Sequence, residues 1–196
     1  IKKALTGAYD ALSSGYLLGG EFLLYSELQA ADGEISWVGT YNQPREIFNK
    51  TILTNNSYVR DTWTEAYSTI NICNNIIAAI DKVNEDDRDR VMGEAFFIRG
   101  ITYFNLITFY AKPYSHGNTT EAESGVPLVL TPTTGINEES YVSRNTVEEV
   151  YAKIIEDLST AESLLPDEND VFATNIAAAG FLSRVYLQME KYPEAL

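Results

Sequence analysis

Hydrophobic residues recur with helical spacing in the middle of the chain. From Asn56 to about Val83, apolar or small side chains return every three or four residues, which predicts one long helix with a buried stripe. The expected stripe consists of Trp63, Tyr67, Ile70, Asn74, Ile77 and Ile80. Because Trp63 lies on this stripe, we expect its ring to pack in the core.

A second helix is predicted to follow a short charged segment. Residues 85–89 are mostly acidic and suit the start of a helix, whose partial charge is positive there. Residues 91–110 are apolar on almost every side, so neighbouring elements must cover this central helix. It should end at Lys112, because a residue before a proline is pushed out of helical conformation. We expect its side chains Phe97, Ile101 and Phe104 to be buried.

Two more helices are predicted beyond a polar insertion. Residues 114–144 hold glycine, serine, threonine and two prolines around one apolar run at residues 126–130, which predicts an extended strap with a little strand. Thr146 and Glu149 have the spacing of a capping box, which starts a helix containing Tyr151, an expected core residue. The last predicted helix opens at Thr174 and stops near Met189.

The sequence pattern of the amino-terminal part predicts two shorter helices and a long loop. The helices cover residues 3–12 and 22–28, with a glycine-rich turn at residues 15–20 between them. Residues 31–55 keep neither helical nor strand periodicity, and binding groups tend to lie on loops that a rigid frame supports. We therefore expect the functional residues within 31–55.

The predicted fold class is all-α, with tetratricopeptide-like helix pairs, long loop insertions and at most a short extended segment. Tyr67 and Ile70 of the first pair match Tyr151 and Ile154 of the second at one common offset, as repeated helix hairpins would. We interpret residues 1–196 as one domain. Its first residues read as helix and its last ones as the opening of another helix, so we expect both ends to be truncated.

Charge and composition exclude several classes of partner. The 196-residue chain has a formal charge of −14, which repels the phosphate backbone, so nucleic acid is not an expected partner. No apolar run is long enough to span a membrane, and the one cysteine, Cys73, permits no internal disulfide.

Catalytic and metal sites lack suitable residues. The chain has one histidine, His116, and Cys73 falls inside a predicted helix, so neither a serine triad nor a cysteine–histidine pair is supported. The acidic clusters lack calcium-loop spacing and suit helix starts. A carboxylate pair for glycoside hydrolysis depends on spatial separation, and no motif supports one. Arg99 and Arg184 fit ion pairs, or snorkelling of the charged group to the surface, better than ligand binding. We expect no catalytic residues, no metal and no cofactor.

The loop at residues 31–55 has the side chains that sugar binding needs. Flat aromatic faces cover the apolar faces of sugars, while amides, carboxylates and guanidinium groups reach hydroxyls. Trp37 could equally be a plug packed against the scaffold. The candidate platforms are Trp37 and Tyr41, and the candidate hydrogen-bonding groups are Asn42, Arg45, Asp32 and Glu34.

Four stretches together resemble the SusD/RagB family of Bacteroidetes outer-membrane lipoproteins. They cover residues 63–75, 93–106, 125–130 and 147–158, and Leu164-Leu165-Pro166 follows them in the same order. The resemblance implies a tetratricopeptide-like amino-terminal portion of a longer protein, whose carboxy-terminal region supplies part of the ligand site. The family's lipidated cysteine is missing here, and this chain has a longer polar stretch between Pro113 and Gly125.

The same resemblance implies the function. Such a protein binds a glycan or another nutrient at the cell surface without catalysis, in polysaccharide utilisation and nutrient uptake. It would be anchored to the outer membrane by lipid and deliver its ligand to a SusC-like TonB-dependent transporter. The alternative is a tetratricopeptide adaptor that binds a peptide on its concave face. The long insertions favour the first interpretation, since a plain solenoid has little use for them.

Overall fold

The computed structural model describes residues 1–136 and 138–196, and within them it contains α-helices and short 3-10 helices but no strand. The all-α prediction is therefore confirmed. The chain divides into two compact units, one formed by residues 10–68 and the other by residues 1–9 together with 69–196. No helix in the described part of the chain is both long and apolar enough to cross a membrane.

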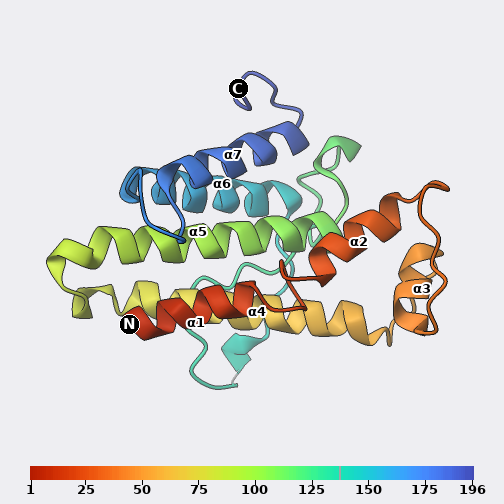
Figure 1. Cartoon of the computed structure of the whole chain (residues 1–196), viewed down its shortest axis with the longest axis horizontal. Coiled ribbons are helices and arrows are strands. Elements are labelled where there is room, and N and C mark those ends of the chain that lie inside the picture. Colours follow the sequence, from red (N-terminus) through yellow and green to blue (C-terminus); the bar gives the residue numbers. More distant parts are fainter. Residues whose placement is uncertain (137) are drawn as a thin grey trace. The chain divides into compact units, whose positions relative to one another are not determined.

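The larger unit is built around three stacked helices, α5 (Glu85–Tyr110), α6 (Val147–Leu164) and α7 (Asn175–Gln188). Figure 1 shows α6 between α5 and α7, and both pairs are in contact. The helices α5 and α6 run antiparallel, and they approach each other closely where α5 carries glycine. A Cβ atom added to Gly100 would lie 3.0 Å from Cγ of Leu158, and one added to Gly93 would lie 3.0 Å from Cγ of Leu165.

The predicted core and helix starts of this unit are confirmed. Phe97, Ile101, Phe104 and Tyr151 are all buried. Thr146 and Glu149 form both hydrogen bonds of a capping box at the start of α6. The side chain of Thr174 accepts a hydrogen bond from the backbone N–H of Ala177 and caps α7. Local sequence chemistry thus fixes where these helices begin.

The buried face of α4 (Ser57–Ala78) differs from the predicted stripe. The rings of Trp63 and Tyr67 pack in a tilted arrangement with centroids 4.9 Å apart, but both residues remain partly exposed, so the expectation of a core Trp63 holds only in part. Small and polar side chains such as Ala66 and Thr69 lie on the buried face beside Ile70 and Ile76, whereas the sequence pattern favoured large aromatic ones. The 3-10 helix η1 (Ile80–Lys82) follows α4. The buried α4 residues are Thr62, Ala66, Thr69, Ile70, Cys73, Asn74 and Ile76.

The strap at residues 126–131 is extended but forms no strand, so the expected little strand is wrong. Side chains take the place of a neighbouring strand. The Tyr103 hydroxyl accepts a hydrogen bond from N–H of Val129 at 2.8 Å and donates to the carbonyl of the same residue at 3.0 Å. Asn145 Oδ1 accepts from N–H of Leu128 at 2.9 Å. These hydrogen bonds satisfy backbone groups that would otherwise pair with a neighbouring strand. The short 3-10 helices η2 (Tyr114–His116) and η3 (Glu138–Ser140) flank the strap in sequence.

The smaller unit contains α2 (Glu21–Ala30), α3 (Asn42–Phe48), the end of α1 (Lys2–Leu12) and the first half of α4. The helix α3 lies inside the segment predicted to be a continuous loop, which is a correction. Its seven residues are too few to show periodicity. Pro44 is tolerated in its first turn, where a backbone N–H has no helical partner, and Ile47 anchors it in the core.

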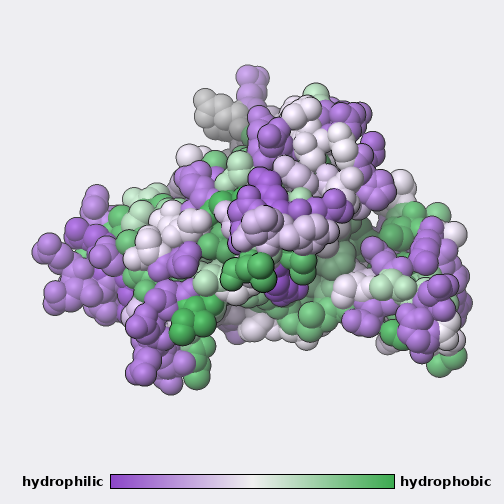
Figure 2. Space-filling model, turned by 90° about the horizontal axis from the view of Figure 1, so that it is seen from above, coloured by the Kyte–Doolittle hydropathy of each residue, from purple (hydrophilic) through white to green (hydrophobic). Residues whose placement is uncertain are grey.

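Apolar side chains also reach the surface of the molecule. Figure 2 shows hydrophobic areas scattered among hydrophilic ones on the face that it presents. Such a mosaic is ordinary for a folded protein. Surface hydrophobicity alone therefore does not locate a binding site here.

Candidate functional site

Trp37 braces a tight turn between α2 and α3. Its indole Nε1 donates a hydrogen bond to the backbone carbonyl of Tyr41 at 3.3 Å. Its ring lies against Gly39, where an added Cβ would be 2.6 Å from Cζ2 of the indole. Trp37 is partly buried by these contacts. The ring of Trp37 thus packs on the turn, and the side chain is only partly buried.

Arg45 closes the same turn from the side of α3. Its Nη2 donates to the carbonyl of Gly39 at 2.7 Å, and its Nη1 lies 3.5 Å from Oδ1 of Asn42. The structure therefore brings four of the six predicted residues together: Trp37, Tyr41, Asn42 and Arg45. We call this group the Trp37–Arg45 turn.

The polar and aromatic side chains of the Trp37–Arg45 turn are open to solvent. Tyr41 is 64% exposed, and Asn42 and Arg45 are exposed as well. An exposed phenol ring, an amide and a guanidinium group close together in sequence are the groups that can cover an apolar face and also donate to and accept from hydroxyls. The turn therefore has groups that can contact both an apolar surface and hydroxyl groups.

Asp32 and Glu34 form a separate turn of the same loop. The backbone N–H of Asp32 donates to Oε2 of Glu34 at 3.0 Å, and Gly33 between them has φ +104°, which favours glycine. Hydrogen bonds from the backbone N–H groups of Glu34 and Asp32 lower the pKa of the Glu34 carboxyl. Glu34 is therefore charged at neutral pH but is partly occupied with its own turn.

The support beneath the Trp37–Arg45 turn comes from the start of α4. Asn56 is buried, and its side-chain amide donates to the carbonyl of Gln43 and to the carboxylate of Glu46 on α3. The sequence identified Asn56 only as the point where a long helix begins. Its structural role could have been predicted from its position, because asparagine directly before a helix is a favoured cap.

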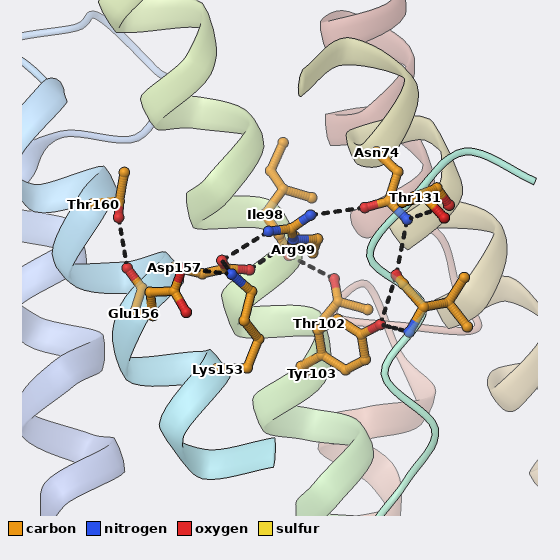
Figure 3. Close-up of polar contacts among 11 residues, drawn as sticks. Asn74, Ile98, Arg99, Thr102, Tyr103, Thr131, Lys153, Glu156, Asp157 and Thr160 are labelled. Atoms are coloured by element: carbon orange, nitrogen blue, oxygen red, sulfur yellow. Dashed lines mark hydrogen bonds and ion pairs between the residues drawn. The ribbon is translucent and has the colours of Figure 1, made fainter. Parts of the chain in front are cut away.

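A second polar cluster lies inside the larger unit (Figure 3). Arg99 donates from Nε and Nη2 to the two carboxylate oxygens of Asp157, at 2.7 and 2.8 Å, and from Nη1 to Oδ1 of Asn74 at 2.8 Å. Asn74 in turn donates to the carbonyls of Val129 and Thr131 in the strap. The expectation that Arg99 serves an ion pair is confirmed. The cluster joins α4, α5, α6 and the strap.

Burial and charge act in opposite directions on this cluster. Burial alone would lower the pKa of the Arg99 guanidinium, but the hydrogen bonds and charge of Asp157 outweigh it and raise that pKa. Burial also raises the pKa of Tyr103, which remains a neutral hydroxyl able to bind the strap. Arg184 lies over the rings of Phe181 and Phe104, 5.2 and 6.0 Å from their centroids, so its guanidinium packs on aromatic faces. Both arginines thus have structural contacts.

The one cysteine and the one histidine of the chain have different surroundings. Cys73 is buried, and burial raises the pKa of its thiol to about 12, so it is protonated at neutral pH. His116 lies on the exposed surface. Within residues 1–136 and 138–196, no cluster of three or more His, Cys, Asp or Glu side chains is arranged to hold a metal ion.

Comparison with known proteins identifies relatives along the whole chain. The model of the SusD-like family, described as starch-binding and associating with the outer membrane, matches residues 1–187. A SusD-like protein, P2, of Formosa agariphila is 26% identical, and the alignment covers 100% of this chain but 37% of that protein. A SusD superfamily structure from Bacteroides fragilis superposes with a TM-score of 0.87 at 29% identity, covering 99% of this chain and 46% of the other. A putative sugar-binding protein from Bacteroides vulgatus superposes with a TM-score of 0.86 at 30% identity, covering 100% and 43%.

Proposed function

The chain belongs to the SusD-like family, and on that basis we propose that it contributes to glycan binding at the outer membrane through the Trp37–Arg45 turn. The family's description as starch-binding supports this proposal, as does the similarity to the putative sugar-binding protein of Bacteroides vulgatus. The chain spans well under half the length of these relatives. The activity proposed is therefore that of the full-length protein.

One observation carries the assignment to this turn. Tyr41 is 64% exposed, and the hydrogen-bonding groups of Asn42 and Arg45 stand within four residues of it in sequence. A sugar ring has an apolar face of C–H groups and an edge of hydroxyls, so it matches an aromatic surface bordered by an amide and a guanidinium. Trp37 adds part of its ring and holds the turn in shape. Asp32 and Glu34 are proposed as outer acceptors for hydroxyls.

A binding role suits this site better than a catalytic one. Cys73 is buried and protonated, and His116 is not part of the Trp37–Arg45 turn. We propose that the full-length protein is a surface lipoprotein that holds a glycan without cleaving it. Its partner would be a SusC-like TonB-dependent transporter, which receives the glycan.

Binding can be tested with the purified full-length protein. We expect it to be retarded in gels containing amylopectin or another polysaccharide from a panel, and to bind maltoheptaose or a matching oligosaccharide in calorimetry. No reducing ends should appear during incubation. Absence of binding to every glycan in the panel, or steady release of reducing ends, would refute the proposal.

The proposed partner needs a separate test in the native membrane. The protein should co-purify with a TonB-dependent transporter from detergent-solubilised outer membranes. Recovery of the lipoprotein alone, under conditions in which a known transporter complex stays intact, would contradict the partnership.

A further inference from the structure

Asn56 uses every hydrogen-bonding group of its side chain. It is 4% exposed and precedes the first residue of α4, where its Oδ1 accepts from N–H of Val59 at 3.3 Å. Its Nδ2 donates to the carbonyl of Gln43 at 3.1 Å and to Oε2 of Glu46 at 2.7 Å. A helix cap needs only the oxygen. The two N–H groups are directed at α3 instead.

Glu46 completes the connection from the other side. Its Oε2 also accepts from the backbone N–H of Leu53 at 3.3 Å, so one carboxylate oxygen joins α3, the returning segment and the start of α4. A helix of seven residues is too short to be stable alone and depends on such tertiary contacts. The Asn56–Glu46 pair thus helps to hold α3 in position, together with the buried side chains of Pro44 and Ile47.

We propose that Asn56 and Glu46 are positioning residues of the glycan site, which hold the Trp37–Arg45 turn in its binding shape without touching the sugar. This inference rests on the proposed function of that turn. Asn42 and Arg45 belong to α3, and Tyr41 is the residue at its amino-terminal cap. Any rotation or fraying of α3 moves these three side chains together.

The contacts within the turn carry such a movement as far as Trp37. Arg45 holds the carbonyl of Gly39, Gly39 supports the indole ring, and the indole N–H is bonded to Tyr41. A loosened α3 releases each of these contacts. The sugar must then order the turn when it binds, and that cost reduces affinity.

The substitution Asn56→Asp separates the two roles of Asn56. Aspartate keeps an oxygen to cap α4 but loses both donors and places a carboxylate against Glu46. In the full-length protein we expect affinity for maltoheptaose, or for the tightest glycan of the panel, to fall about tenfold, which corresponds to about 1.4 kcal/mol. The Trp37 indole N–H, assigned by its loss in Trp37→Phe, should exchange with solvent faster than in the wild type.

The double variant Asn56→Asp with Glu46→Gln provides the rescue. The pair then has its donor and acceptor exchanged, since the glutamine amide can donate to the aspartate, and both affinity and indole protection should return toward wild-type values. Asn84→Asp is the matched control. Asn84 occupies the equivalent position before α5, and its side chain makes no capping bond there. Both readouts should be unchanged in this control.

The two readouts distinguish failure of the positioning role from failure of the proposed function. If the wild type binds no glycan, the proposed function fails, while the exchange rate of the indole still decides whether the Asn56–Glu46 pair positions the turn. Unchanged affinity and unchanged indole exchange in Asn56→Asp would overturn the inference. If Asn56→Asp does not fold, Glu46→Ala removes the acceptor while leaving the α4 cap intact, and the same two outcomes apply.

Discussion

Arg99 of α5 and Asp157 of α6 form a bidentate ion pair, with nitrogen–oxygen distances of 2.7 and 2.8 Å. The pair is buried, since the two side chains are only 3% and 1% exposed. The pair lies 58 residues apart in sequence. Through Asn74 it also holds the strap. It is therefore the point at which the helices of the larger unit and its long insertion depend on one another.

Breaking this pair from one side should be costly. Asp157→Asn leaves the Arg99 guanidinium buried without a counter-charge, and we expect the free energy of unfolding to fall by about 3–5 kcal/mol in urea denaturation. Adding Arg99→Met to Asp157→Asn should recover part of this loss, because the unpaired charge is removed. The exposed pair Arg60–Asp61 is the control, and Arg60→Met should cost less than about 1 kcal/mol. The single variant Arg99→Met completes the comparison. If the loss of stability in the double variant equals the sum of the losses in Asp157→Asn and Arg99→Met, a buried charge effect is contradicted.

Replacement of glycine by alanine should change the stability of the protein in opposite directions in α5 and in α7. In Gly100→Ala the new Cβ would press on Leu158, at 3.0 Å, so overpacking of about 1–3 kcal/mol should exceed the gain in helix propensity. Gly180 in α7 is exposed, and no atom lies within 4 Å of the place that an added Cβ would take, so Gly180→Ala should stabilise the protein by about 0.5–1 kcal/mol. Thermal unfolding of both variants gives the comparison. A stabilised Gly100→Ala protein would show that α5 and α6 do not approach so closely.

The capping box of α6 predicts a dependence of stability on pH. Backbone N–H of Thr146 and the amide of Asn145 donate to Glu149 and lower the pKa of its carboxyl. A lowered folded-state pKa stabilises the fold above the unfolded value of about 4.3, and that contribution disappears as pH falls through the folded-state pKa. Wild type should therefore exceed Glu149→Gln in melting temperature at neutral pH, with the difference shrinking toward about pH 3.

Glu162→Gln is the control for this experiment, since it removes an exposed carboxylate near the other end of α6. It should not reproduce the pH-dependent difference. A constant gap between wild type and Glu149→Gln across the pH range would contradict a contribution from the ionised carboxylate.

The aromatic residues of the Trp37–Arg45 turn should differ in their effect on stability. Tyr41→Ala removes an exposed ring, so glycan binding by the full-length protein should weaken by about 1–3 kcal/mol while the melting temperature stays unchanged. Trp37→Ala should weaken binding and also lower the melting temperature slightly, because its ring packs on Gly39. Calorimetry and thermal unfolding measure the two quantities. If Trp37→Ala reduces only stability, Trp37 is a plug and Tyr41 is the platform.

The sequence by itself determined the longer helices and several of their starting points. The periodicity of residues 91–110 identified the central helix, and Thr146, Glu149 and Thr174 marked where the next helices begin. These features depend on neighbours within a few positions along the chain, which is why they can be predicted locally. The loop containing Trp37 and Tyr41 was also recognisable from its composition.

Only the tertiary structure decided which distant groups meet. The partner of Arg99, the side chains that hold the strap, and the support that Asn56 gives to α3 all join residues from separate elements. The short helix α3 was missed for the same reason, since seven residues carry little periodicity and rely on contacts made elsewhere. Packing likewise placed residues such as Ala66 and Ile76 of α4 on the buried face, in preference to Trp63 and Tyr67. Such choices depend on the shape and hydrogen-bonding needs of neighbouring elements, and these exist only once the chain has folded.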